Sequence, residues 1–155
     1  MKSFVSFIAL LIGFSHLALC QDTTFTQKDF DSAKVYYKTK EIPQFIKDKL
    51  TQLAGEKIRM VDAGRRFQAT DNITTNLPTR RLICFIEMPG RYILFYEIGG
   101  RRGAPIGNYM IFKVNTSIVE SCTGHSVRIH HSFDAFKTFL LSKNNTEYDL
   151  GEMEY

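Results

Sequence analysis

The sequence predicts an α+β fold, in which an antiparallel meander of about six or seven short strands packs with an N-terminal amphipathic helix and a C-terminal helix. Three observations lead to this prediction. A helical apolar stripe covers 43–54, strand-like segments follow between 57 and 130, and a second helical pattern covers 133–142. Residues 80–98 are almost continuously apolar, so we expect both faces of the sheet to be covered. A closed β-barrel with flanking helices is the alternative that fits the same pattern.

The first residues of the chain have the three-part build of a secretory signal peptide. Lys2 supplies the positive end, residues 4–19 form an apolar run, and Ala18 and Cys20 place small side chains at the −3 and −1 positions of a cleavage site. The cleanly apolar stretch is shorter than the roughly 20 residues that a membrane-spanning helix needs. We therefore expect residues 1–20 to be a cleaved signal peptide.

The remainder has the size of one ordinary domain. We expect a single globular α+β domain at 21–143 and an acidic, flexible tail at 144–155. Such a protein is secreted and extracellular, without a transmembrane segment. The whole chain carries a formal net charge of +4, which is too small and too dispersed to indicate a nucleic-acid partner.

Two covalent features of exported proteins are predicted for the mature chain. Cleavage leaves Cys84 and Cys122, which in an oxidising compartment most simply form one disulfide; two buried free thiols are the alternative. N-glycosylation sequons occur at Asn72, Asn115 and Asn144. All three asparagines fall where the pattern predicts loops, so we expect a glycoprotein.

Two helices are predicted ahead of the strands. The first covers 27–38 with Thr26 as its N-cap, although its apolar residues fit helical spacing only loosely. The second covers 43–54, with Pro43 in its first turn and Gly55 as its C-terminal stop. The residues that form its apolar stripe are Ile42, Phe45, Ile46, Leu50, Leu53 and Ala54. We interpret this stripe as a face toward the core.

Short segments rich in Ile, Val, Phe and Tyr follow, separated by turn residues. The predicted strands are 57–63, 65–70, 80–87, 91–98, 108–114, 117–122 and 125–130. Met88-Pro89-Gly90 is a strong turn signal between two of them. The final helix, at about 133–142, has Ser132 as its N-cap. Its inward-facing residues are Phe133, Phe136, Phe139 and Leu140.

The most distinctive segment is the connection at 99–107, which is longer than a tight hairpin requires. It is rich in glycine and carries the adjacent pair Arg101 and Arg102. Glycine-rich backbone offers N–H groups to anions, and arginine side chains match carboxylate, phosphate or sulfate. The predicted anion- or partner-binding residues are Arg101, Arg102, Arg65, Arg66, Arg80 and Arg81. A solvated connector with scattered surface arginines is the simpler alternative.

Motifs for catalysis or metal binding are missing from the sequence. There is no G-x-S-x-G turn, and His130 and His131 would point to opposite faces of a strand and could not chelate together. A convincing zinc site needs three or four ligands at workable spacing. We therefore predict no enzymatic activity, no cofactor and no metal.

These observations favour a secreted, non-enzymatic binding glycoprotein that contacts an extracellular macromolecule or anionic surface through basic loops. The partner would be an extracellular protein or a sulfated or acidic glycan. The alternative is a carrier of a small hydrophobic ligand in a lipocalin-like cavity, because aromatic residues in adjacent strands can line a pocket as well as fill a core. Those aromatic residues are Phe85, Tyr92, Phe95, Tyr96, Tyr109 and Phe112.

Overall fold

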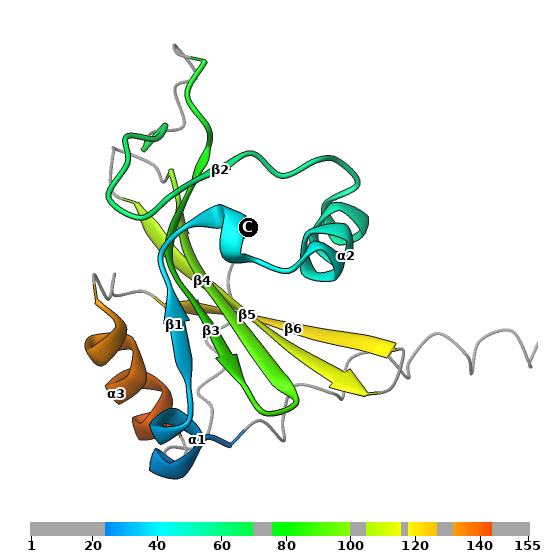
Figure 1. Ribbon diagram of the computed structural model, residues 1–155. Helices are drawn as coiled ribbons and strands as arrows, with labels where there is room; N and C mark the ends of the chain where they lie inside the picture. The colour runs from blue at the N-terminus through cyan, green and yellow to red at the C-terminus, as the bar shows by residue number, and fades with distance from the viewer. Residues whose placement is uncertain (1–23, 70–75, 100–104, 116–117, 127–131, 144–155) are drawn as a thin grey trace, which may run out of the picture.

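The computed structural model describes residues 24–69, 76–99, 105–115, 118–126 and 132–143. In this part of the chain a six-stranded sheet lies between helices that pack on both of its faces (Figure 1). The strands are β1 (Lys34–Tyr36), β2 (Met60–Val61), β3 (Arg80–Met88), β4 (Arg91–Ile98), β5 (Ile106–Asn115) and β6 (Ile118–Ser126). The predicted α+β class with an antiparallel sheet is confirmed.

The sheet has the order β1-β3-β4-β5-β6, and every pair of neighbours on this path is antiparallel. β3 and β4 are joined by a tight turn at Pro89-Gly90, where Gly90 has a φ of 70° that side chains disfavour. The short β2 pairs in parallel with the first residues of β3. β1 pairs with the last part of the same edge of β3. Within the described ranges β1 and β6 lie at opposite edges, so the closed-barrel alternative is wrong.

β1 forms where the sequence predicted the second half of a helix over 27–38. The helix α1 (Gln27–Asp31) begins at the predicted N-cap, because Thr26 and the third helical residue exchange side-chain hydrogen bonds with each other's backbone. It then ends early, and the following residues pair with β3. The Tyr36 hydroxyl donates to the Glu87 carboxylate at 2.9 Å. Pairing with β3 therefore prevails over a weak helical pattern.

The other strand predictions differ from the structure in their boundaries. Of the predicted strand 57–63 only Met60–Val61 is a strand, and the described part of 65–70 contains none. The predicted strands 117–122 and 125–130 are wrong as two elements, because β6 pairs with β5 without interruption across the expected turn. A continuous ladder satisfies the backbone groups that a turn would leave unpaired.

The helix α2 (Gln44–Ala54) packs on one face of the sheet. Pro43 immediately precedes it, and Gly55 ends it in the left-handed conformation with a φ of 69°. The core on this side contains Ile42, Ile46, Leu50, Leu82, Phe85, Leu94, Met110 and Phe112. Three members of the predicted stripe are exposed: Phe45 by 38%, Leu53 by 52%, and Ala54. The buried face is therefore narrower than the predicted stripe.

The opposite face is covered by α1 and by α3 (Phe133–Lys143), which is seen beside β1 in Figure 1. The Ser132 hydroxyl accepts a hydrogen bond from the Ala135 amide at 3.2 Å, as expected of an N-cap. The ring of Phe136 stacks on that of Phe95, with their centroids 4.0 Å apart. Both rings are fully buried. The aromatic residues of the strands thus pack into the two cores. The sheet is open, so it has no barrel interior in which a lipocalin-like cavity could form.

Candidate functional site

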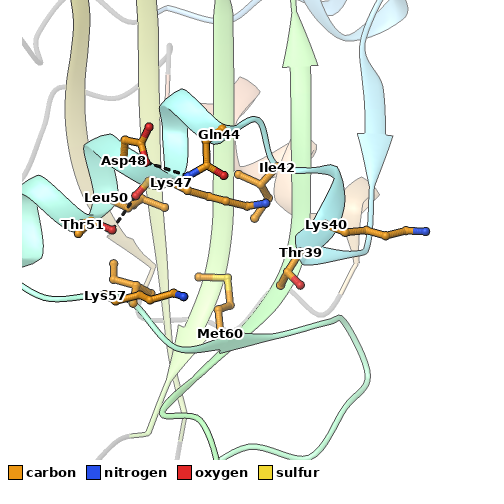
Figure 2. A pocket seen from close by; sticks show the side chains of 11 residues that line it. Thr39, Lys40, Ile42, Gln44, Lys47, Asp48, Leu50, Thr51, Lys57 and Met60 are labelled. Carbon is orange, nitrogen blue, oxygen red and sulfur yellow. Dashed lines mark hydrogen bonds between the residues drawn. The ribbon is translucent and has the colours of Figure 1, made fainter.

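A hollow of about 590 Å³ lies between α2, the short 3-10 helix η1 (Thr39–Glu41) and the segment that leads into β2 (Figure 2). Its lining residues are Thr39, Lys40, Ile42, Gln44, Lys47, Asp48, Leu50, Thr51, Lys57, Ile58 and Met60. The elements around the hollow meet because α2 and the segment 57–60 both pack on the same core. The site therefore depends on the tertiary fold.

The floor of the hollow is apolar. Ile42 and Leu50 are only 4% and 5% exposed. Ile58 and Met60 are partly buried and pack against the same core from the other side. These side chains leave an apolar surface between two elements that the core holds in place.

The edge of the hollow is basic. Lys47 is partly buried, whereas Lys40 and Lys57 are exposed. Figure 2 shows Lys47 and Lys57 extending in the same direction across the hollow, while Lys40 extends outward from η1. The acidic lining residue, Asp48, accepts a hydrogen bond from the Gln44 amide at 2.8 Å. None of the three lysines forms an ion pair with another described residue, so their charges are available to an anion.

A second, shallower hollow of about 440 Å³ continues from the first and shares Thr39 and Met60 with it. Its lining includes Arg65 and Arg66, both exposed. The carboxylate of Asp62 lies here and accepts hydrogen bonds from the backbone N–H and the hydroxyl of Thr39, each at 2.7 Å. The backbone hydrogen bond, the hydroxyl and the nearby Arg65 lower the pKa of Asp62. This carboxylate is thereby engaged in joining η1 to the end of β2.

The basic residues of the two hollows form one surface, which we call the basic rim: Lys40, Lys47, Lys57, Arg65 and Arg66. Of this set, the two arginines were among the residues predicted from the sequence, and the three lysines were not. In the sequence these lysines look like the polar side of an amphipathic helix and its flanks. Only the position of α2 over the segment before β2 brings them together, so no local signal could have found them.

Arg80 and Arg81 do not join the basic rim as a pair. Arg81 forms an ion pair with Glu97, whose side chain is 3% exposed. Its guanidinium also donates to the Arg65 carbonyl at 3.2 Å and lies 4.6 Å from the ring centroid of Phe67. Arg80 lies on the face of β3 opposite to that of Arg81, because the side chains of successive strand residues alternate between the two faces. The role of Arg81 is therefore to hold the fold together.

The remaining predicted basic pair, Arg101 and Arg102, lies outside the described residues. The same holds for the signal peptide at 1–20, the tail at 144–155, and the two sequons at Asn72 and Asn144. The third sequon begins at Asn115, the last residue of β5, which pairs with the first residue of β6. Asn115 was expected in a loop and is instead the final strand residue of β5.

Cys84 is a free thiol in the structure and is fully buried in β3. Burial raises the pKa of this thiol to about 12. Cys122 belongs to β6, and two strands lie between β6 and β3. Because neighbouring strands are about 4.8 Å apart, the two cysteine backbones are separated by roughly 14 Å, well beyond the ~7 Å between Cα atoms that a disulfide spans. The sheet order therefore favours the alternative of unpaired thiols over the expected Cys84–Cys122 disulfide.

Comparison with protein-family models, curated proteins and solved structures finds no match for this chain. No helix in the described ranges has both the length and the apolar character to cross a membrane. In the same residues, no three His, Cys, Asp or Glu side chains gather in a way that could hold a metal ion. The candidate site therefore rests on the geometry and chemistry of the basic rim.

Proposed function

We propose that this protein is a secreted, non-enzymatic binding glycoprotein that contacts an extracellular macromolecule or an anionic surface through the basic rim. The observation that carries this proposal is the gathering of five cationic side chains around two continuous hollows. None of them forms an ion pair with another described residue. Guanidinium and ammonium groups that are not engaged in ion pairs can bind carboxylate, sulfate or phosphate through charge-assisted hydrogen bonds.

The acidic residues that line the two hollows, Asp48 and Asp62, carry two negative charges against the five positive charges of the basic rim, so the surface keeps an excess of positive charge. Asp62 is bound to Thr39 through two hydrogen bonds, and Asp48 is hydrogen-bonded to Gln44. An exposed ion pair contributes only about 0–1 kcal/mol, so one such contact would not hold a partner. Several contacts made together give useful affinity, and this affinity should fall with salt.

A comparison of two double variants tests the role of the basic rim. The variant Arg65→Ala/Arg66→Ala removes two positive charges from it, and Lys28→Ala/Lys34→Ala removes two exposed charges from α1 and β1. On a heparin column we expect the first variant to elute at clearly lower salt than the unmodified protein and the second to elute close to it. Equal shifts for both variants would show that only net charge matters, and the proposal would be abandoned.

Secretion and glycosylation are separate parts of the proposal, supported by the signal-peptide pattern and the sequons. Expression of the full chain in a eukaryotic cell provides the test. We expect the protein in the medium, with Gln21 as its first residue and a mass that decreases after enzymatic removal of N-glycans. An intracellular product that retains residues 1–20 and carries no glycan would contradict this part.

A further inference from the structure

We infer that the hollow beneath α2 binds a free single-chain amphiphile with a negatively charged head group, such as a long-chain carboxylate. This inference rests on the proposed anion recognition by the basic rim and names the ligand class for one part of it. The apolar chain would lie on the floor of the hollow, and the head group would contact Lys47 and Lys57.

The lining of the hollow has an apolar part and a basic part. Ile42 and Leu50 are almost fully buried beneath the hollow, and the partly buried Ile58 and Met60 offer its accessible apolar surface beside α2. The volume of about 590 Å³ lies within the range of about 300–1,000 Å³ that is typical of small-molecule sites. Met60 is the most adaptable of these side chains, since an unbranched thioether conforms to varied apolar shapes.

The basic edge of the hollow complements a negatively charged head group. The side chain of Lys47 is partly buried along the hollow and, like that of Lys57, extends across it (Figure 2). Long lysine stems cover apolar surface while their ammonium groups stay in water. Asp48 also belongs to the lining, and its carboxylate is hydrogen-bonded to Gln44. Lysine ammonium groups beside an apolar floor select an anionic head group over a neutral or cationic one.

Calorimetric titration with dodecanoate below its micelle concentration, using the full mature protein, tests the inference. We expect one dodecanoate per protein, and at least tenfold weaker binding for the alcohol and the trimethylammonium compound of the same chain length. Equal affinity for all three would overturn the role of the lysines. Binding to phosphatidylglycerol vesicles without binding of dodecanoate would overturn the inference in favour of a membrane surface.

Three variants locate the ligand. Lys47→Glu should weaken dodecanoate binding at least tenfold, whereas Lys49→Glu, on the same helix but outside the lining, should change it less than twofold. Thr51→Trp should fill the hollow, since Thr51 is exposed and lines it. Unchanged binding by either Lys47→Glu or Thr51→Trp would refute the inference.

Heparin retention of the Thr51→Trp variant separates this inference from the proposed function. The substitution changes no charge, so the variant should lose dodecanoate and keep its elution salt. If the unmodified protein binds heparin through the basic rim but binds no dodecanoate, the inference fails and the proposed function stands. If dodecanoate binds while Arg65→Ala/Arg66→Ala leaves heparin retention unchanged, the proposed function fails and the hollow is a ligand site in its own right.

Discussion

Arg81 and Glu97 form an ion pair across β3 and β4, with the Glu97 side chain 3% exposed and the Arg81 side chain 27% exposed. The second carboxylate oxygen, Oε2 of Glu97, is buried and has no hydrogen-bond partner among the residues that the structure describes. Arg81 therefore supplies the main compensation for a buried charge. It also contacts the segment that carries Arg65, through that residue's carbonyl and the ring of Phe67. The same guanidinium thus stabilises the sheet and fixes one end of the basic rim.

Removal of Arg81 should destabilise the fold strongly. Arg81→Ala leaves the Glu97 carboxylate uncompensated, and we expect the free energy of unfolding to fall by about 3 kcal/mol, the lower end of the range for buried pairs because Arg81 is partly exposed. Urea unfolding measures this loss. The double variant Arg81→Ala/Glu97→Gln should recover part of it, because the buried charge is gone. A loss below about 1 kcal/mol in the single variant would indicate an ordinary surface pair.

Cys84 should be inert in the folded protein and reactive after unfolding. At pH 8 we expect iodoacetamide to leave Cys84 unmodified in native protein, because its burial prevents both ionisation and access. In urea without reductant the same residue should be alkylated fully, as peptide mass mapping would show. If Cys84 stays unmodified in urea until reductant is added, Cys84 forms a disulfide in the mature protein and the prediction of an inert free thiol is wrong.

The raised pKa of Cys84 also predicts a dependence of stability on alkaline pH. The unfolded thiol ionises near its ordinary value of 9.0 and the folded thiol at about 12. Between these values the unfolded state has lost a proton that the folded state keeps, so stability falls as pH rises, by about 1.4 kcal/mol per pH unit. Denaturant titrations of the unmodified protein and of Cys84→Ala measure this slope, which should be shallower in the variant. Parallel slopes would show that the thiol ionises freely in the folded state.

Phe136 should contribute more to stability than any exposed aromatic residue of the helices. Its ring is fully buried and stacked on Phe95, so Phe136→Ala should cost about 3–5 kcal/mol. Phe45 of α2 is a matched control, because it is 38% exposed and contacts Tyr92 edge-on. We expect Phe45→Ala to cost less than half as much in the same thermal or urea experiment. Equal costs would mean that α3 does not pack on the sheet as described.

Asp62 should make stability sensitive to acid. Its pKa is lowered by the hydrogen bonds from Thr39, so its contribution is present above the ordinary value of 3.8 and is lost as pH falls through the lower folded value. Asp62→Asn should therefore reduce the steepness of the stability decrease below pH 4. Circular dichroism during acid titration would show the difference, and identical acid profiles would contradict the role of this carboxylate.

Local signals in the sequence were sufficient for the elements whose boundaries depend on near neighbours. The helix at α2 lies between Pro43 and Gly55, and the turn between β3 and β4 contains Pro89 and Gly90. Each signal acts through backbone dihedral angles or missing donors within a few residues. The continuous apolar character of 80–98 likewise indicated a sheet covered on both faces, as the two cores show.

The tertiary structure decided the features that join distant parts of the chain. Tyr36 is a strand residue because β1 pairs with β3, and its hydroxyl bonds to Glu87, which is 51 positions away. The order of β3 and β6 separates Cys84 from Cys122. The hollow exists because η1, α2 and the segment 57–60 surround one site. Sequence patterns report propensities over a few residues, whereas these contacts depend on which surfaces bury one another, and that is settled only when the whole chain packs.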